Sequence, residues 1–113
     1  MTDTNFNDWI GMRRGDRENE VVVDTRPEHQ VAPGLVHFAV LTTMAEVSAA
    51  SSTGASVVPT TVHVNLMRRA APGRLVARGT LVKRGRTLAV AEGEVFQEDK
   101  LVAKATVTFA VMG

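Results

Sequence analysis

The chain contains no cysteine and no tyrosine, and aromatic residues make up only 4% of its 113 residues. Without cysteine there is no disulfide, no thiolate nucleophile and no thiolate-bound metal. The scarcity of aromatic residues argues against the stacking platform of single-strand nucleic-acid binders. No run of about 18 apolar residues predicts a membrane-spanning helix, and no segment resembles a signal peptide. We therefore expect a cytoplasmic protein that binds neither membrane nor nucleic acid.

The remaining composition is that of an ordinary globular domain, with 44% apolar residues, 22% charged residues and a net charge of +1. This length fits one hydrophobic core, so residues 1–113 are expected to form a single domain. The charges are unevenly placed, because residues 68–86 hold seven Lys and Arg and no acid. The small net charge argues against a general electrostatic grip on nucleic acid, but it leaves one concentrated basic block.

The hydrophobic pattern predicts an order of elements. In the opening segment, Asn7 or Asp8 could cap a short turn that carries Trp9 and Ile10 inward. Residues 20–26 read as a strand that Pro27 ends. Residues 35–50 lack Pro and Gly and have apolar residues on every side of a helical wheel, which predicts a helix buried all round.

The second half of the chain alternates with a period of two residues. Four strands of roughly ten residues are expected at 57–67, 74–83, 87–96 and 101–112, separated by turn signals such as Pro72-Gly73. Short connections between consecutive strands predict an antiparallel meander. The fold class is therefore α+β, with an antiparallel sheet curled around one long central helix.

Several segments, in order along the chain, resemble one family. They are FNDWIGM, PGLVHFAVLTTMAE, TTVHVNLMRRA and LVKRGRTLAVAEGEVFQEDKLVAKATVTF. Together they resemble the hotdog fold of the PaaI-like, 4-hydroxybenzoyl-CoA thioesterase-like superfamily. This resemblance implies hydrolysis of acyl-CoA or acyl-carrier thioesters. The family's G-x-x-H-G-G segment carries an acid nine residues after its His, which corresponds here to His37 and Glu46. Phe38 and Ala39 stand in place of the two glycines, and in this respect the chain resembles a divergent branch of the family that has His-Phe at these positions.

Glu46 is the only Asp, Glu, Lys or Arg between Glu28 and Arg68. Burial in an apolar helix should raise the pKa of this carboxyl, and a base nearer neutrality suits proton abstraction. Glu46 is therefore expected to act as a general base or as a nucleophile on the thioester carbonyl. Hydrolysis of a thioester also needs a donor for the oxyanion. The first turn of a helix has backbone N–H groups without helical partners, and the resemblance implies that the N–H of Phe38 is the one that contacts the oxyanion.

Phe38 and Glu46 lie on one helical stripe but two turns, about 12 Å, apart. One helix therefore cannot easily offer both groups to one carbonyl. The resemblance implies a homodimer, and further a homotetramer, in which each site takes the donor from one subunit and the acid from the other. His37 is expected to orient the preceding loop, and Thr61 or its neighbour Thr60 to hold the attacking water.

The resemblance also gives the basic block a role. It implies that the turn formed by Lys83, Arg84, Gly85, Arg86 and Thr87 contacts the phosphates of coenzyme A, which is part of the acyl-CoA substrate and not a separate cofactor. Cations and free turn N–H groups suit such a ligand. No metal is expected, because neither His29 nor His63 has a second ligand at metal-binding spacing.

Two other functions stay open. One is a hotdog protein that binds an acyl chain or coenzyme A without catalysis, which the Phe38-Ala39 substitution favours. The other is an acyl-thioester hydratase or dehydratase, whose pattern is a His, then Pro-Gly-x-Leu, and a Glu about fourteen residues after the His. Here Glu46 follows His29 by seventeen residues, so the spacing disfavours this reaction.

Overall fold

The computed structural model describes residues 5–112, and within them the chain forms two α-helices, one 3-10 turn and eight strands. In chain order these are α1 (Phe6–Trp9), β1 (Arg13–Arg14), β2 (Glu20–Asp24), the 3-10 turn η1 (Pro27–His29), β3 (Gln30–Ala32), β4 (Leu35–Val36), α2 (Phe38–Ser52), β5 (Val57–Leu66), β6 (Arg74–Arg84), β7 (Leu88–Gln97) and β8 (Lys100–Val111).

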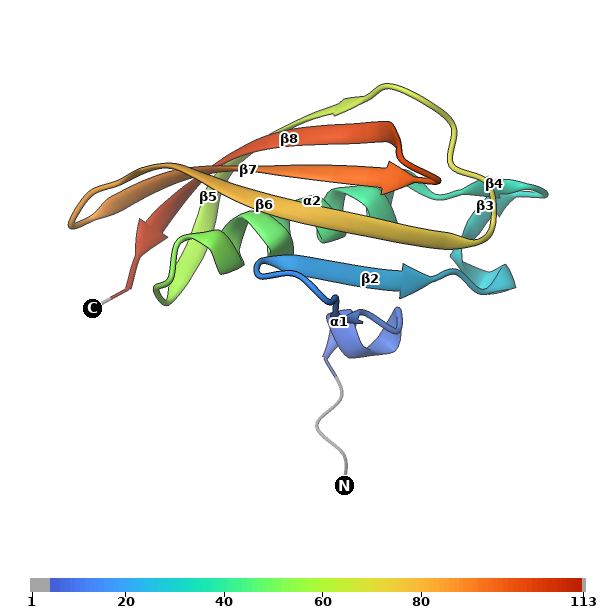
Figure 1. Cartoon of the computed structure of the whole chain (residues 1–113), viewed down its shortest axis with the longest axis horizontal. Coiled ribbons are helices and arrows are strands. Elements are labelled where there is room, and N and C mark those ends of the chain that lie inside the picture. The colour runs from blue at the N-terminus through green and yellow to red at the C-terminus, as the bar shows by residue number, and fades with distance from the viewer. Residues whose placement is uncertain (1–4, 113) are drawn as a thin grey trace.

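Within the described residues, six strands form one antiparallel sheet in the order β1-β2-β6-β7-β8-β5, and β3 pairs with β4 in a separate ribbon. Figure 1 shows the long strands β6, β7 and β8 spread over α2, with α1 beyond β2 at the N-terminal side. The predicted α+β class, the four strands of the second half and the antiparallel sheet around one long helix are confirmed.

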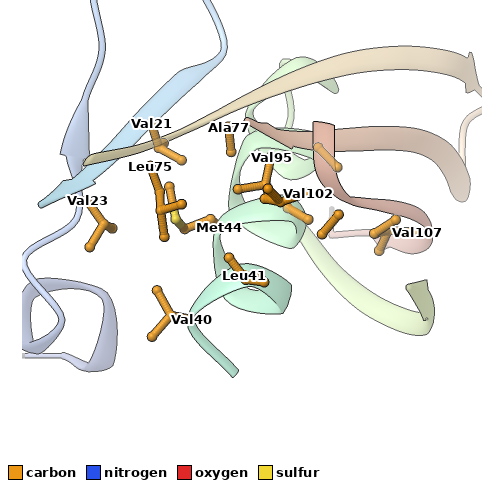
Figure 2. Close-up of a cluster of buried hydrophobic side chains, with 14 of the residues drawn as sticks. Val21, Val23, Val40, Leu41, Met44, Leu75, Ala77, Val95, Val102 and Val107 are labelled. Atoms are coloured by element: carbon orange, nitrogen blue, oxygen red, sulfur yellow. The ribbon is translucent and has the colours of Figure 1, made fainter. Parts of the chain in front are cut away.

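Alternation along the strands supplies the sheet side of the core. On β8, Ala103, Ala105, Val107 and Phe109 are fully buried on the face toward α2. Figure 2 shows Leu41 and Met44 of α2 among the buried side chains of the sheet, which include Leu75, Val95 and Val107. Such interdigitation removes a large apolar area from water and is the main force holding the helix on the sheet.

Two glycines let the helix backbone approach the sheet closely. Gly79 and Gly93 are directly paired across β6 and β7. A Cβ added at Gly93 would lie 2.8 Å from the Cα of Ala45 and still nearer its carbonyl group, and one at Gly79 would lie 2.9 Å from the backbone N of Ala49. Contacts this short do not occur in folded proteins, so only glycine fits at the helix crossing.

The helix begins three residues later than predicted. Leu35 and Val36 form β4 instead, and the backbone N–H of Val36 donates to the carbonyl of Ala70 at 2.9 Å. Helix α2 starts after His37, whose Nδ1 accepts the backbone N–H of Ala39 at 3.0 Å as a side-chain cap. The expectation for the opening turn is also wrong, because Asn5 caps α1.

Candidate functional site

Helix α2 has one face on the sheet and one open face. The buried side is made of Val40, Leu41, Met44, Ala45, Ser48 and Ala49. The opposite side is at least partly exposed and consists of Phe38, Ala39, Thr42, Thr43, Glu46, Val47 and Ala50. The prediction of a helix buried all round is therefore wrong within one chain, since Phe38 is exposed and the rest of this face is only partly covered by residues 5–112.

Glu46 is the single charge on this open face and is about half buried. Loss of water around the carboxylate raises its pKa above the ordinary value of 4.5, and no other influence on this pKa is found within the described chain. A carboxylate in this state is a stronger base than an exposed glutamate, so it can take a proton from water more readily.

The N-terminus of α2 presents one free backbone donor. The N–H of Ala39 is bound by His37 Nδ1, and the N–H of Val40 donates to the His37 carbonyl at 3.1 Å. Within residues 5–112 the N–H of Phe38 has no acceptor. It lies at the positive end of the helix dipole, where an anionic oxygen is favoured. His37 thus supports the turn by capping, and its own N–H donates to the His29 carbonyl at 2.8 Å.

An apolar groove of about 360 Å³ runs beside this N-terminus. The ring of Phe38 is 55% exposed along it and stacks on the ring of His37, with centroids 4.7 Å apart. Two cations, Arg68 and Arg69, complete its lining, which also includes Val31, Leu35, Val36, Leu41, Leu66, Met67 and Ala70. The groove suits a ligand with an apolar stem and an anionic end.

Arg68 and Arg69 were not selected by the sequence reasoning as binding residues. The available signal was their place as the first two cations of the acid-free block. Their proximity to the start of α2 depends on the connection after β5, which returns past β4. The N–H groups of Met67 and Arg68 both donate to the Val102 carbonyl, at 2.9 and 3.2 Å, and this fixes that connection.

The predicted phosphate-binding turn is the tip of the β6–β7 hairpin and is exposed throughout. Arg84 donates to the carbonyl of Thr53 at 3.0 Å, so its guanidinium holds the C-terminal end of α2. Gly85 N–H is used within the turn, donating to the Leu88 carbonyl at 2.7 Å. Lys83 and Arg86 make no ion pair among residues 5–112. Figure 1 shows this hairpin at the end of the molecule opposite β3 and β4, far from the start of α2.

Thr61 lies on the other face of the sheet. It pairs with Thr108, whereas the neighbouring Val107 and Phe109 are fully buried beneath α2. Residues directly opposite each other share a face, so the Thr61 side chain points away from the helix. The structure therefore does not bring Thr61 together with Glu46 in one chain. Thr60 occupies a bulge in β5, and its hydroxyl donates to the Thr108 carbonyl at 3.1 Å.

Among residues 5–112, no group of three or more His, Asp and Glu side chains is arranged to hold a metal ion. None of the described helices is long and apolar enough to cross a membrane.

Comparison with known proteins identifies the family. The family model for the acyl-CoA thioesterase N-terminal domain matches residues 27–110, a stretch that begins at η1 and ends within β8. It therefore includes the groove, Glu46, the helix N-terminus and the basic turn. Comparison with curated proteins finds no match.

Solved structures show the same fold. A phenylacetic acid degradation-related protein from Ralstonia eutropha JMP134 is 28% identical, with a TM-score of 0.79 over 93% of this chain and 88% of that one. A thioesterase from Haemophilus influenzae is 20% identical, with a TM-score of 0.88 over 98% and 85%. A Bacillus halodurans protein whose structure contains CoA is 20% identical, with a TM-score of 0.85 over 98% and 78%. At 20% identity the last two likenesses show the fold alone.

Proposed function

Because this chain belongs to the acyl-CoA thioesterase family and has its hotdog fold, we propose that it hydrolyses acyl-CoA thioesters at a site shared by two subunits. One observation carries the proposal: the open side of α2 holds both a half-buried carboxylate, that of Glu46, and a backbone donor without an acceptor, the N–H of Phe38. The CoA-containing Bacillus halodurans relative supports coenzyme A as the carrier of the acyl group.

In the proposed reaction Glu46 is the general base. Its carboxylate takes a proton from a water molecule, whose oxygen attacks the thioester carbonyl. The tetrahedral oxyanion accepts a hydrogen bond from the N–H of Phe38. Collapse of this intermediate breaks the carbon–sulfur bond, and the coenzyme A thiolate receives the proton held by Glu46. The products are a carboxylic acid and a free thiol.

The two groups cannot act on one carbonyl from a single helix. Eight residues separate Phe38 from Glu46, which corresponds to about 12 Å along the axis. An antiparallel pair of α2 helices, related by a two-fold axis, would set the acid of one chain near the first turn of the other. The open, nearly uncharged face of α2 supports this arrangement, because it is the surface that such a pairing would bury.

The outer edge of the sheet supports the same dimer. Strand β5 has only β8 as a neighbour within residues 5–112, and its other edge is free. The strand contains no Asp, Glu, Lys or Arg, and Val58, Val62 and Leu66 are 41–49% exposed. A long apolar edge without charges is a template for pairing with another strand. We propose that β5 pairs with β5 of a second copy, which continues the sheet across the dimer.

The proposed dimer would also bring the basic turn of one chain close to the substrate bound by the other chain. In one chain the turn lies at the C-terminal end of α2, whereas the groove lies at the N-terminal end. Antiparallel pairing would move the partner chain's turn toward this groove. We propose that Lys83 and Arg86 of the partner chain and Arg68 of this chain share the coenzyme A phosphates. Arg84 stays on the carbonyl of Thr53 and contributes through the shape of the turn.

Three variants test the proposal. Phe38→Pro removes the proposed oxyanion donor, yet proline is favoured at the first helical position, and the extended backbone of His37 (ψ 137°) suits a following proline. The matched control Phe38→Ala keeps the N–H and removes the ring. Glu46→Gln removes the base with little change in size.

The assay follows free thiol released from a panel of acyl-CoA thioesters. We expect Phe38→Pro to lower kcat about 10²- to 10³-fold relative to Phe38→Ala. We expect Glu46→Gln to lower kcat by about two orders of magnitude or more, with an unchanged circular dichroism spectrum. Unchanged turnover in Glu46→Gln would refute its role as base.

A non-catalytic role has one specific observation in its favour. The Phe38 ring projects along the groove where the resembling enzymes have glycine. A binding protein would show a rise in melting temperature with coenzyme A or acyl-CoA but no thiol release from any member of the panel. In that case Phe38→Gly, which removes the ring and keeps the N–H, would not create turnover either.

A further inference from the structure

The connection between β5 and β6, residues 67–73, carries the two cations of the groove and is itself neither helix nor strand. The side chains of Arg68 and Arg69 are exposed, and neither forms an ion pair among residues 5–112. Their place at the groove therefore depends on what holds the backbone of this connection.

Main-chain hydrogen bonds hold the connection to neighbouring segments. Its first two N–H groups donate to the carbonyl of Val102 in β8, and the carbonyl of Ala70 accepts the N–H of Val36 in β4. At its end, the N–H of Thr25 donates to the carbonyl of Gly73 at 3.0 Å, and the Thr25 hydroxyl accepts the N–H of Gly73 at 2.7 Å. A side chain supplies one further anchor, at residue 71.

That side chain is Gln97, the last residue of β7. Its Oε1 accepts the N–H of Ala71 at 3.0 Å, and its Nε2 donates to the carbonyl of the same residue at 2.6 Å. Pro72 favours extended backbone at Ala71, and in extended backbone the N–H and the carbonyl of one residue point to the same side. An amide has an acceptor and a donor next to each other, so Gln97 can bind both groups at once. We call this pair of bonds the Gln97 clamp.

The base of the Gln97 clamp is rigid because it belongs to a tight hairpin. Gln97 pairs with Lys100 across the turn, and the two residues between them, Glu98 and Asp99, have positive φ angles of 50° and 65°. A two-residue turn of this kind matches the twist of its strands. Figure 1 shows the connection at the same end of the sheet as this turn. Gln97 and both arginines line one hollow of about 410 Å³, so the clamp lies beside the two cations.

We propose that Gln97 is a positioning residue for substrate binding, whose clamp on Ala71 holds Arg68 and Arg69 where they meet the phosphate-bearing end of a coenzyme A thioester. The inference rests on the proposed function for the identity of this ligand. Both polar atoms of Gln97 are used on Ala71, so Gln97 acts through the arginines and not by touching the substrate.

The effect of the clamp is to reduce the freedom of the two arginines before the ligand arrives. Without it, the middle of the connection could shift while the main-chain anchors at its ends remain. Both long side chains would then lose more conformational entropy when they bind a phosphate. The loss should therefore appear in binding and not in the chemical step.

Two variants separate the clamp from the other anchors. Gln97→Met removes both bonds and keeps nearly the same size. Because the two bonds are exposed, we expect the melting temperature to fall by about 5 °C or less. Thr25→Val is the matched control. It removes the hydroxyl bonds to Gly73, at the end of the connection away from the arginines, and keeps the main-chain bond there.

The measurement is the Kd for coenzyme A by isothermal titration calorimetry, beside KM and kcat for acyl-CoA and acyl-pantetheine. Gln97→Met should raise the Kd for coenzyme A and the KM for acyl-CoA about three- to tenfold, which is the usual effect of freeing one or two long side chains. It should leave kcat and the KM for acyl-pantetheine unchanged. Thr25→Val should change the Kd by less than about twofold.

A double-mutant cycle tests whether Gln97 acts through the arginines. In a chain that carries both Arg68→Gln and Arg69→Gln, addition of Gln97→Met should raise the Kd for coenzyme A no further. A further rise of the same size as in the wild-type background would overturn the inference. An unchanged Kd in Gln97→Met, or an equal rise in Thr25→Val, would overturn it as well.

The outcomes separate the two proposals. If coenzyme A binding depends on Gln97 but no thioester is hydrolysed, the proposed hydrolysis is refuted and this inference stands. If thioesters are hydrolysed and Gln97→Met has the wild-type Kd, only this inference is refuted. If the wild-type chain does not bind coenzyme A, both are refuted. A merely structural role of Gln97 would lower kcat for acyl-CoA and acyl-pantetheine alike, and that result would also overturn the inference.

Discussion

Replacing Gly93 with alanine should destabilise the protein severely, although alanine in place of a strand glycine normally stabilises by about 0.5–1 kcal/mol. The added methyl carbon would lie 2.8 Å from the Cα of Ala45 and nearer still to its carbonyl group. Both contacts are backbone atoms, so no side chain can rotate away. Relief requires α2 to move off the sheet by about 1 Å, which opens the contacts of Met44 and its neighbours throughout the core.

The expected loss of stability follows from that displacement of α2. Overpacking of a core commonly costs 1–3 kcal/mol, and a backbone clash at a helix crossing should reach at least about 3 kcal/mol. A domain of this length has a total stability of roughly 6–17 kcal/mol, so the loss is a large share of it. The melting temperature should fall by about 10 °C or more.

The assay is thermal and urea unfolding followed by circular dichroism at one fixed protein concentration, since association would shift the transition. Gly85→Ala is the matched control, because an added Cβ there would be 3.2 Å from the Leu88 carbonyl oxygen in an exposed hairpin. The control should change stability by less than about 1 kcal/mol. An alanine at Gly93 that is neutral or stabilising would refute the close contact between α2 and β7.

Three further predictions concern the proposed site and the proposed dimer. Burial raises the pKa of Glu46 above 4.5, so the rate of hydrolysis should decline as the pH falls below that raised pKa. The free energy of unfolding should decrease as the pH rises from 4.5 through the same pKa, because the folded state then has to hold a charged carboxylate. Glu46→Gln should remove both pH dependences, measured in rate profiles and melting curves. Replacing Lys83 or Arg86 with Gln should raise KM for acyl-CoA about fivefold each and leave acyl-pantetheine, which lacks the nucleotide phosphates, unaffected. Val62→Lys on the free edge of β5 should give a monomer by sedimentation with an unchanged circular dichroism spectrum, whereas Val82→Lys, a change at another exposed apolar side chain, should not.

Much of the fold could be predicted because the strands carry their pattern locally. Residues 101–112 alternate with a period of two, and on β8 the alternating residues Val107 and Phe109 are fully buried toward α2. The start of α2 could not be predicted in the same way. Leu35 and Val36 are compatible with a helix, and only their pairing with β3 and Ala70 makes them a strand.

One residue of the candidate site stands out in the sequence because it is unusual for its surroundings. Glu46 is the single charge in a long uncharged stretch, and the structure places it half buried on the open helix face. The face of Thr61 was not predictable, because a bulge at Thr60 shifts the alternation of β5 by one residue. Arg84 also looks like a free cation in the sequence, and only the folded chain brings it to the carbonyl of Thr53.

The burial of His29 could not be predicted from the sequence pattern. His29 is buried because α1, η1 and α2 come together around it, and no spacing of residues in the sequence indicates this contact. The same holds for Arg68 and Arg69, whose place at the groove depends on a connection that returns past β4. Contacts between segments far apart in the sequence decide which of several cations or histidines reaches a site.

The central claim is that each active site takes its base from one chain and its oxyanion donor from the other. The most direct measurement is thiol release by a mixture of two inactive variants, Glu46→Gln and Phe38→Pro, co-refolded at equal concentration. Random pairing makes half of the dimers mixed, and each mixed dimer has one intact site of two, so the account predicts recovery of about a quarter of the wild-type rate. No recovery above either variant alone, with mixed dimers demonstrated by a tag on one chain, would contradict the shared site.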